Sequence, residues 1–128
     1  MAQSILLIDD EQDVVVVEKE LLECLGYEVT AMTSGSEAIA CFKRDPARYS
    51  LVITDYNMPD LDGLELTCQF KRLSPQTPVV LVSGFLTLSG DTVRTAGVAA
   101  ALTKPLGLEE LGRTVRRTIA PAGPDIPH

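Results

Sequence analysis

Histidine is almost absent from this sequence of 128 residues, because its one histidine is the last residue, His128. A Ser-His-Asp or Cys-His catalytic site is therefore effectively excluded, as is a histidine phosphodonor within the chain. Basic residues are also few: 11 lysines and arginines stand against 18 acidic residues, giving a formal net charge of −7. Since lysine and arginine supply most of the affinity for a phosphate backbone, this balance argues against nucleic-acid binding.

Cysteines and long apolar runs are scarce as well. Cys24, Cys41 and Cys68 are odd in number, lack the spacing of metal ligands and fall in predicted helices. We interpret them as small buried apolar residues in a reducing compartment. No apolar run could span a bilayer, and no basic region precedes the first apolar segment. We therefore expect a cytoplasmic protein, or one tethered to a membrane sensor within a longer chain.

Short apolar segments alternate with helical patterns through the chain. The apolar segments are residues 5–8, 27–31, 51–54, 78–82 and 98–102, and the helical patterns cover 13–25, 36–45, 63–73, 85–96 and 108–119. This alternation predicts an α/β domain over residues 1–119, with a doubly wound parallel sheet covered by helices on both faces. The Pro-rich segment 120–128 has no packing pattern and is expected to be a disordered tail or linker.

The helical patterns carry expectations about packing and capping. In the first helix, the apolar spacing predicts an inward face made of Val14, Val17, Leu21 and Leu25. Ser34 and Glu37 resemble a capping box at the start of the second helix. In the last helix, the predicted apolar stripe is Leu108, Leu111, Val115 and Ile119.

Polar and charged residues follow four of the predicted strands. Asp9 and Asp10 follow the first strand, Asp55 the third, Ser83 the fourth and Lys104 the fifth. In a doubly wound parallel sheet the carboxyl ends of the strands lie along one edge, where such folds bind ligands. We therefore expect these five residues to converge there.

This group of residues suits phosphoryl chemistry. Two carboxylates about 4 Å apart repel by roughly 4 kcal/mol at an effective dielectric constant of 20, so a cation must lie near Asp10 and Asp55. Candidates are Lys104 and a divalent cation that prefers oxygen ligands, for which Mg²⁺ is the natural fit. An oxygen of Asp55 could then attack a phosphoryl group to form an aspartyl phosphate, with the Ser83 hydroxyl donating a hydrogen bond to it.

The same residues carry a family resemblance. The set Asp9-Asp10, Asp55 with Met58-Pro59, Ser83, and Lys104-Pro105 resembles the receiver domain of two-component response regulators, over residues 4–119. The resemblance implies a flavodoxin-like fold with strand order 2-1-3-4-5. It also implies that a histidine kinase or phosphotransfer domain supplies the phosphoryl group. The domain would catalyse its own phosphorylation and dephosphorylation, and it contains no kinase module.

The resemblance assigns a role to each site residue. Asp55 would be the phosphoacceptor, Asp10 a direct Mg²⁺ ligand, Asp9 a ligand through water, the Asn57 backbone carbonyl a further ligand, Lys104 the partner of the phosphoryl group and Ser83 the switch hydroxyl. The peptide bond before Pro105 would be cis. A weak homodimer through the fourth and fifth helices is also within the family's range.

One position departs from the family pattern. Ala101 stands where receivers usually have a tyrosine or phenylalanine that moves inward when the domain is phosphorylated. Phe85 could substitute for it by repacking, or could be an ordinary loop aromatic. Without the usual aromatic, the sequence favours a role in relaying or storing the phosphoryl group over a strong conformational switch.

Other functions fit the sequence less well. A haloacid-dehalogenase-type phosphatase needs a second acid two residues after its nucleophile, where this chain has Asn57. A flavodoxin-type flavin site would place a phosphate beside Asp9 and Asp10, which would repel it. Among receivers, the motifs favour one attached to a hybrid sensor histidine kinase, with a stand-alone receiver as the alternative and an Mg²⁺-dependent aspartyl-phosphate phosphatase as a distant third.

Overall fold

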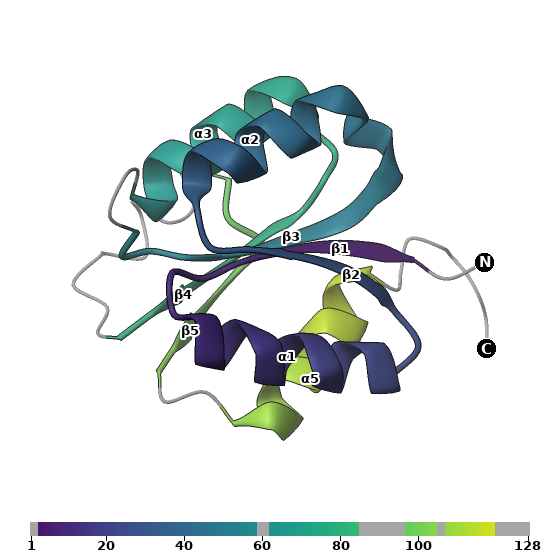
Figure 1. Cartoon of the computed structure of the whole chain (residues 1–128). Coiled ribbons are helices and arrows are strands. Elements are labelled where there is room, and N and C mark those ends of the chain that lie inside the picture. Colours follow the sequence, from purple (N-terminus) through teal and green to yellow (C-terminus); the bar gives the residue numbers. More distant parts are fainter. Residues whose placement is uncertain (1–2, 59–61, 85–96, 105–106, 120–128) are drawn as a thin grey trace.

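The fold is built on one five-stranded parallel sheet (Figure 1). The computed structural model describes residues 3–58, 62–84, 97–104 and 107–119. The strands are β1 (Ser4–Ile8), β2 (Glu28–Met32), β3 (Tyr49–Asp55), β4 (Val79–Ser83) and β5 (Ala100–Thr103), and every neighbouring pair is parallel. Their order is β2-β1-β3-β4-β5, so the predicted fold and strand order are confirmed.

Helices cover both faces of this sheet. They are α1 (Gln12–Cys24), α2 (Gly35–Arg44), α3 (Gly63–Leu73) and α5 (Leu108–Ile119), and a short 3-10 helix, Pro46–Arg48, precedes β3. Figure 1 shows α2 and α3 on one face and α1 and α5 on the other. None of the helices in the described part of the chain has the length and hydrophobicity that a membrane crossing requires. The helix predicted at 85–96 and the tail at 120–128 lie outside the described residues.

The core has two halves, one on each side of the sheet. Alternate side chains of β1 point to opposite faces: Ile5 and Leu7 pack toward α1 and α5, and Leu6 and Ile8 toward α2 and α3. All four are buried. A strand covered on both faces needs apolar residues at every position, which explains the uninterrupted apolar run of this strand.

The inward face of α1 differs from the prediction. The buried residues are Val15, Glu18 and Leu22, whereas Val17 and Leu25 are exposed. The predicted face was therefore wrong by one position along the helix. Four consecutive valines make every side of the helix apolar, and a glutamate was not expected to point inward. The apolar pattern alone therefore could not locate the buried face of α1.

Two helices begin with side-chain caps. The Ser34 hydroxyl accepts a hydrogen bond from the Glu37 backbone N–H at 3.3 Å, as the sequence predicts. At the start of α3, the Asp62 carboxylate accepts one from the Glu65 backbone N–H at 2.9 Å. Both caps satisfy N–H groups that the helix itself leaves unbonded.

The cysteines are less buried than predicted. All three are free thiols, but Cys24 and Cys68 are exposed and Cys41 is half-buried, with its sulfur 3.2 Å from the Tyr49 hydroxyl. Each lies in a helix, as expected, but on or near its solvent side. Their interpretation as buried apolar residues was therefore wrong.

Candidate functional site

Three aspartates meet at the carboxyl edge of the sheet. Asp55 is the last residue of β3, and Asp9 and Asp10 follow β1, the strand beside it. One carboxylate oxygen from each of the three lies within 4.8 Å of the others. Asp9 and Asp55 are buried and Asp10 is exposed. We call these three residues the acidic centre.

Lys104 brings a positive charge to the acidic centre. Its ammonium group donates hydrogen bonds to Asp55 Oδ2 at 2.9 Å and to Asp9 Oδ2 at 3.3 Å. Its backbone N–H donates to the Ser83 carbonyl at 2.7 Å, which holds the residue beside the end of β4. The Lys104 side chain is 24% exposed, so these ion pairs are partly shielded from water.

Burial and ion pairing act on the pKa values of these groups. Burial raises the pKa of Asp9 and outweighs the opposing hydrogen bond from Glu11 and the charge of Lys104. Burial alone would lower the pKa of Lys104, but its hydrogen bond to Asp55 and the charge of Asp9 raise it. The lysine therefore stays protonated at neutral pH and balances part of the negative charge.

The remaining oxygens of the two buried carboxylates are held by the backbone. Asp9 Oδ1 accepts a hydrogen bond from the Glu11 N–H at 2.9 Å, and Asp55 Oδ1 accepts one from the Asn57 N–H at 3.2 Å. Each carboxylate thus lies between a turn N–H and Lys104. Both side chains are fixed in orientation before any ligand arrives.

The turn after Asp55 is tied to the sheet and to α3. The Tyr56 N–H donates to the Val82 carbonyl at 2.7 Å, and the Tyr56 carbonyl accepts from the Gly63 N–H at 2.8 Å. A Cβ atom at Gly63 would lie 2.7 Å from Tyr56 Cα. From the sequence, Gly63 is expected only as a turn residue at the start of a helix, and its close approach to Tyr56 was not predicted.

The other residues named in the prediction that the structure describes lie at or near the same end of the sheet but differ in burial. Ser83 is the last residue of β4 and is completely buried, at the same sheet edge as Asp55. Asn57 is exposed and contacts Asp55 through its N–H. Ala101 is half-buried in β5, opposite Leu81. The predictions for Phe85 and for the peptide bond before Pro105 lie outside the described residues.

Comparison with known proteins identifies the family. The family model described as "Response regulator receiver domain" matches residues 5–116. The chain belongs to this family. It is a receiver domain of the two-component response regulator type, and such domains interact with histidine kinases or phosphotransfer domains.

Curated relatives and solved structures agree with this assignment. The chain is 30% identical over 122 residues to the response regulator receiver protein CpdR of Brucella abortus (strain 2308), covering 92% of this chain and 98% of CpdR. It is 29% identical over 119 residues to the aerobic respiration control sensor protein ArcB of Escherichia coli (strain K12), covering 91% of this chain and 15% of ArcB. Other curated relatives are also much longer: the chain spans 25% of one and 15% of another.

Among solved structures, a response regulator receiver domain protein from Clostridium thermocellum superimposes with a TM-score of 0.83. Its sequence is 30% identical, and the match covers 91% of this chain and 94% of that one. The receiver fold is thus supported by sequence and by structure.

The acidic centre fits the metal that the family implies. Receiver domains generally bind Mg²⁺ at an acidic pocket, and three aspartates offer the oxygen ligands that this ion prefers. Two of them are oriented by backbone N–H groups, and the exposed third is accessible to an ion from solvent. The single charge of Lys104 leaves the cluster with a net negative charge that a divalent cation would neutralise.

Proposed function

We propose that this receiver domain accepts a phosphoryl group from a phosphohistidine onto Asp55, in an Mg²⁺-dependent reaction. The observation that carries the proposal is the position of Asp55 within the acidic centre, 2.9 Å from the Lys104 ammonium. A carboxylate that is buried, oriented and next to a cation is suited to attack an electrophilic phosphorus atom.

The transfer requires few covalent changes. A lone pair on an Asp55 carboxylate oxygen forms the new bond to phosphorus while the phosphorus–nitrogen bond of the phosphohistidine breaks. The electron pair of the broken bond stays on the imidazole nitrogen. Positioning and charge neutralisation then supply most of the rate enhancement, as in other phosphoryl transfers.

The chain's own residues would stabilise the transferred group. Lys104 already bonds to Asp55 and would shift one hydrogen bond to a phosphoryl oxygen, where negative charge accumulates. The Ser83 hydroxyl, at the end of the adjacent strand, would donate a second hydrogen bond to the phosphoryl group.

Asp10 and Asp55 would hold the metal directly, Asp9 would reach it through water, and the Asn57 carbonyl would add a ligand. Bound Mg²⁺ would supply neutralisation of charge on the phosphoryl oxygens. Asp10 is accessible from solvent, while Asp9 and Asp55 are buried, which favours entry of the ion from the side of Asp10.

The small side chain of Ala101 affects how strongly the domain could change conformation on phosphorylation. The small, half-buried side chain in β5 offers no aromatic ring that could move inward beside Ser83. We therefore propose a role in passing on or storing the phosphoryl group, with only modest changes at the outer surface. Large shifts of NMR signals from α5 after phosphorylation would contradict this part of the proposal.

The receiver domain could belong to either of two kinds of protein. A hybrid sensor histidine kinase is our first proposal, supported by the receiver-like motifs and by the match to a segment of the sensor protein ArcB. A stand-alone receiver is the second, supported by CpdR, which this chain covers almost completely. The genomic sequence on both sides of the coding region distinguishes them, because a kinase module in the same reading frame would decide for the first.

The direct test is labelling with a small phosphodonor. Acetyl phosphate and Mg²⁺ should phosphorylate the wild-type protein, and mass spectrometry should locate the group on Asp55. Asp55→Asn should abolish labelling, since an amide oxygen is a poor nucleophile. Asp62→Asn is the matched control, because Asp62 is an exposed helix cap on the neighbouring loop. Labelling that persists in Asp55→Asn would reassign the phosphoacceptor.

A further inference from the structure

A pocket lies at the amino edge of the sheet, opposite the edge that carries the acidic centre. It has a volume of about 480 Å³ and opens where β3, β4 and β5 begin, beside the last turns of α3 and α5. We call it the amino-edge pocket. The polar residues that line it are Gln3, Ser50, Lys71, Gln76 and Thr118. Pockets that bind small molecules typically have volumes of roughly 300–1,000 Å³, so this one is large enough for such a ligand.

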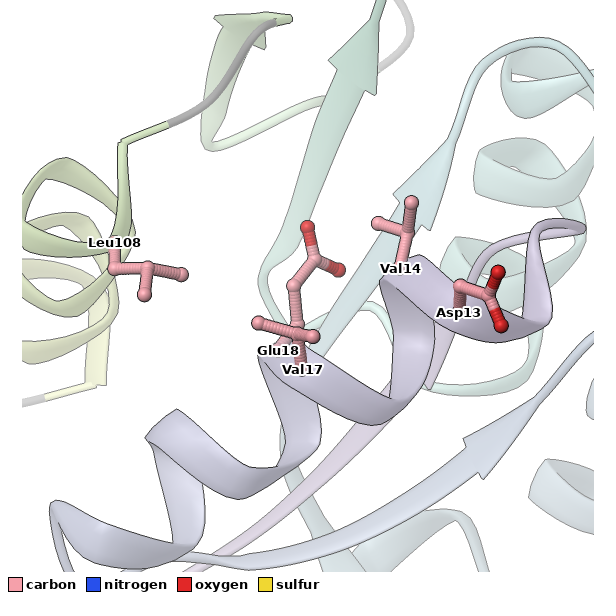
Figure 2. Close-up of a pocket in the computed structure, with 5 residues that line it drawn as sticks. All are labelled: Asp13, Val14, Val17, Glu18 and Leu108. Carbon is pink, nitrogen blue, oxygen red and sulfur yellow. The ribbon is translucent and has the colours of Figure 1, made fainter.

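The charge of the amino-edge pocket differs from that of the chain as a whole. The chain has a formal net charge of −7, yet none of the described residues that line this pocket is acidic, and Lys71 brings a positive charge to it. The pocket between α1 and the start of α5, shown in Figure 2, is lined by two residues with carboxylates, Asp13 and Glu18. Of the two pockets, the amino-edge pocket is therefore the one suited to an anion.

The ammonium group of Lys71 has a hydrogen-bond donor left for a ligand. It donates to the Thr77 carbonyl at 2.9 Å and to the Pro75 carbonyl at 3.2 Å. An ammonium group has three N–H donors, and no other residue that the structure describes accepts the third. Burial lowers the pKa of Lys71, so the two carbonyl oxygens do not fully replace the water that the charge has lost. A negatively charged oxygen from a ligand would supply what is missing.

A β-bulge brings a hydroxyl group to the same pocket. Tyr49 and Leu51 pair with consecutive residues of β1, so Ser50 between them has no partner residue on that strand. Such a bulge changes the direction of a side chain. The Ser50 hydroxyl and the side-chain amides of Gln3 and Gln76 line the pocket as further hydrogen-bond donors beside Lys71.

We propose that the amino-edge pocket binds a small organic carboxylate, with Lys71 as its cationic partner. The carboxylate would accept the third N–H of Lys71, and the hydroxyl and amide donors would bond to its other oxygen. Pro78, Ala99 and Ile119 complete the lining and would contact the hydrocarbon part of the ligand. One ammonium balances one carboxylate, whereas a phosphate group carries more than one negative charge and would stay partly unbalanced. This inference does not rest on the proposed phosphorylation of Asp55.

The test uses butyrate as the probe. Titration of sodium butyrate into the ¹⁵N-labelled, Mg²⁺-saturated protein should shift the amide signals of Ser50, Lys71, Gln76 and Thr118. Uncharged n-butanol, and sodium chloride at the same ionic strength, should produce much smaller shifts at these amides. Inorganic phosphate should bind more weakly than butyrate, because one lysine does not balance its charge.

Two variants test the charge and the space of the pocket separately. Lys71→Gln removes the charge and should weaken butyrate binding by at least about tenfold, the usual effect of losing a hydrogen bond to a charged group. Ala99→Leu fills the pocket from an exposed position and leaves Lys71 in place, so it should abolish binding and keeps the test valid if Lys71→Gln does not fold. Lys43→Gln is the matched control, because Lys43 is an exposed lysine in the last turn of α2 that does not line the pocket. Well-dispersed amide spectra would show which variants fold.

Four outcomes would overturn the inference. Equal shifts with n-butanol would show that the pocket recognises only hydrocarbon, and tighter binding of phosphate would make it a site for a different anion. Unchanged butyrate affinity in either folded variant would show that the carboxylate binds elsewhere. Shifts confined to the amides of Asp9, Asp10 and Asp55 would place the carboxylate on the metal at the acidic centre.

Discussion

The ammonium of Lys104 lies 2.9 Å from Asp55 Oδ2, and the same group lies 3.3 Å from Asp9 Oδ2. One lysine at the end of β5 thus bridges carboxylates delivered by β3 and β1. Without a metal ion, this bridge is what balances two buried negative charges, so the lysine has a structural role in addition to the chemical one proposed for it.

Replacing this lysine should destabilise the metal-free protein. Lys104→Met keeps an unbranched side chain of similar size but leaves Asp9 and Asp55 without their cation. The free energy of unfolding should fall by about 1–3 kcal/mol at neutral pH, less than for a fully buried pair because the lysine is partly exposed. Urea denaturation in the presence of a chelator measures this change.

An exposed ion pair provides the control. On α1, Lys19 Nζ lies 2.7 Å from Glu23 Oε2, and the two side chains are 38% and 44% exposed. Lys19→Met should change the free energy of unfolding by less than about 0.5 kcal/mol, as is usual for surface pairs on a helix. Equal losses in the two variants would mean that the bridge at the acidic centre has no special contribution to stability.

Magnesium should stabilise the folded chain. At a concentration of about 100 times its Kd, an ion that binds only the native state raises the free energy of unfolding by roughly 2.7 kcal/mol. Asp10→Asn should reduce this gain, and because Asp10 is exposed the substitution should barely alter metal-free stability. Thermal denaturation with and without Mg²⁺ tests both points, and an unchanged melting temperature in the wild-type protein would argue against a metal site here.

Gly63 should be intolerant of a side chain. A Cβ atom there would lie 2.5 Å from Leu81 Cδ1 and 2.7 Å from Tyr56 Cα. Since backbone cannot yield as a flexible side chain can, Gly63→Ala should lower the free energy of unfolding by about 1–3 kcal/mol. It should also weaken Mg²⁺ binding, because Tyr56 adjoins Asp55.

Gly107→Ala is the matched control for this substitution. Among the described residues, and apart from the glycine and its chain neighbours, no heavy atom would lie within 4 Å of a Cβ atom at Gly107. Its stability in urea should stay within about 0.5 kcal/mol of the wild type, and its Mg²⁺ affinity should be unchanged. If Gly63→Ala behaved like Gly107→Ala in both measurements, the close approach of α3 to the turn after Asp55 would not matter for the site.

Much of the fold and the position of the acidic centre could be predicted because topology leaves little choice. Once β1 and β3 are recognised as parallel neighbours, residues that follow them must share an edge, so Asp9 and Asp55 had to come close. The convergence of Lys104 on that edge follows in the same way from β5. The shared edge follows from the apolar runs and the rule for parallel strands, whereas the strand order that makes β1 and β3 neighbours was implied by the family resemblance.

Other features depend on packing detail that a single sequence does not carry. The buried face of α1 was predicted one position away, because a run of valines is apolar on every side. The burial of Glu18 follows from the rotation of α1 about its axis, which is set by its contacts with β2, β1 and α5. The glycine requirement at residue 63 likewise arises from the spacing between α3 and the turn after β3.

Stability should depend on pH through Glu18. Its pKa is raised from 4.5 to about 7 in the folded state, so the native protein binds this proton more tightly than the unfolded chain does. The stabilisation of the folded state by the protonated Glu18 side chain is fully present below about pH 4.5. It is lost as pH rises through about 7. On the order of 3 kcal/mol of stability should disappear between about pH 4.5 and about pH 7.

Glu18→Leu removes that dependence while filling the same buried position. Compared with the wild type, the variant should gain stability as pH rises from about 4.5 to about 8, because it has no carboxylate to ionise. The charges of Asp9, Asp55 and Lys104 act on Glu18 and are present in both proteins, so their direct effects largely cancel in the difference. Glu20→Leu, at an exposed position of the same helix, should show a difference from wild type that is nearly constant with pH. Parallel curves for all three proteins in urea denaturation from about pH 4.5 to about pH 8 would show that Glu18 ionises as easily in the folded chain as in the unfolded one.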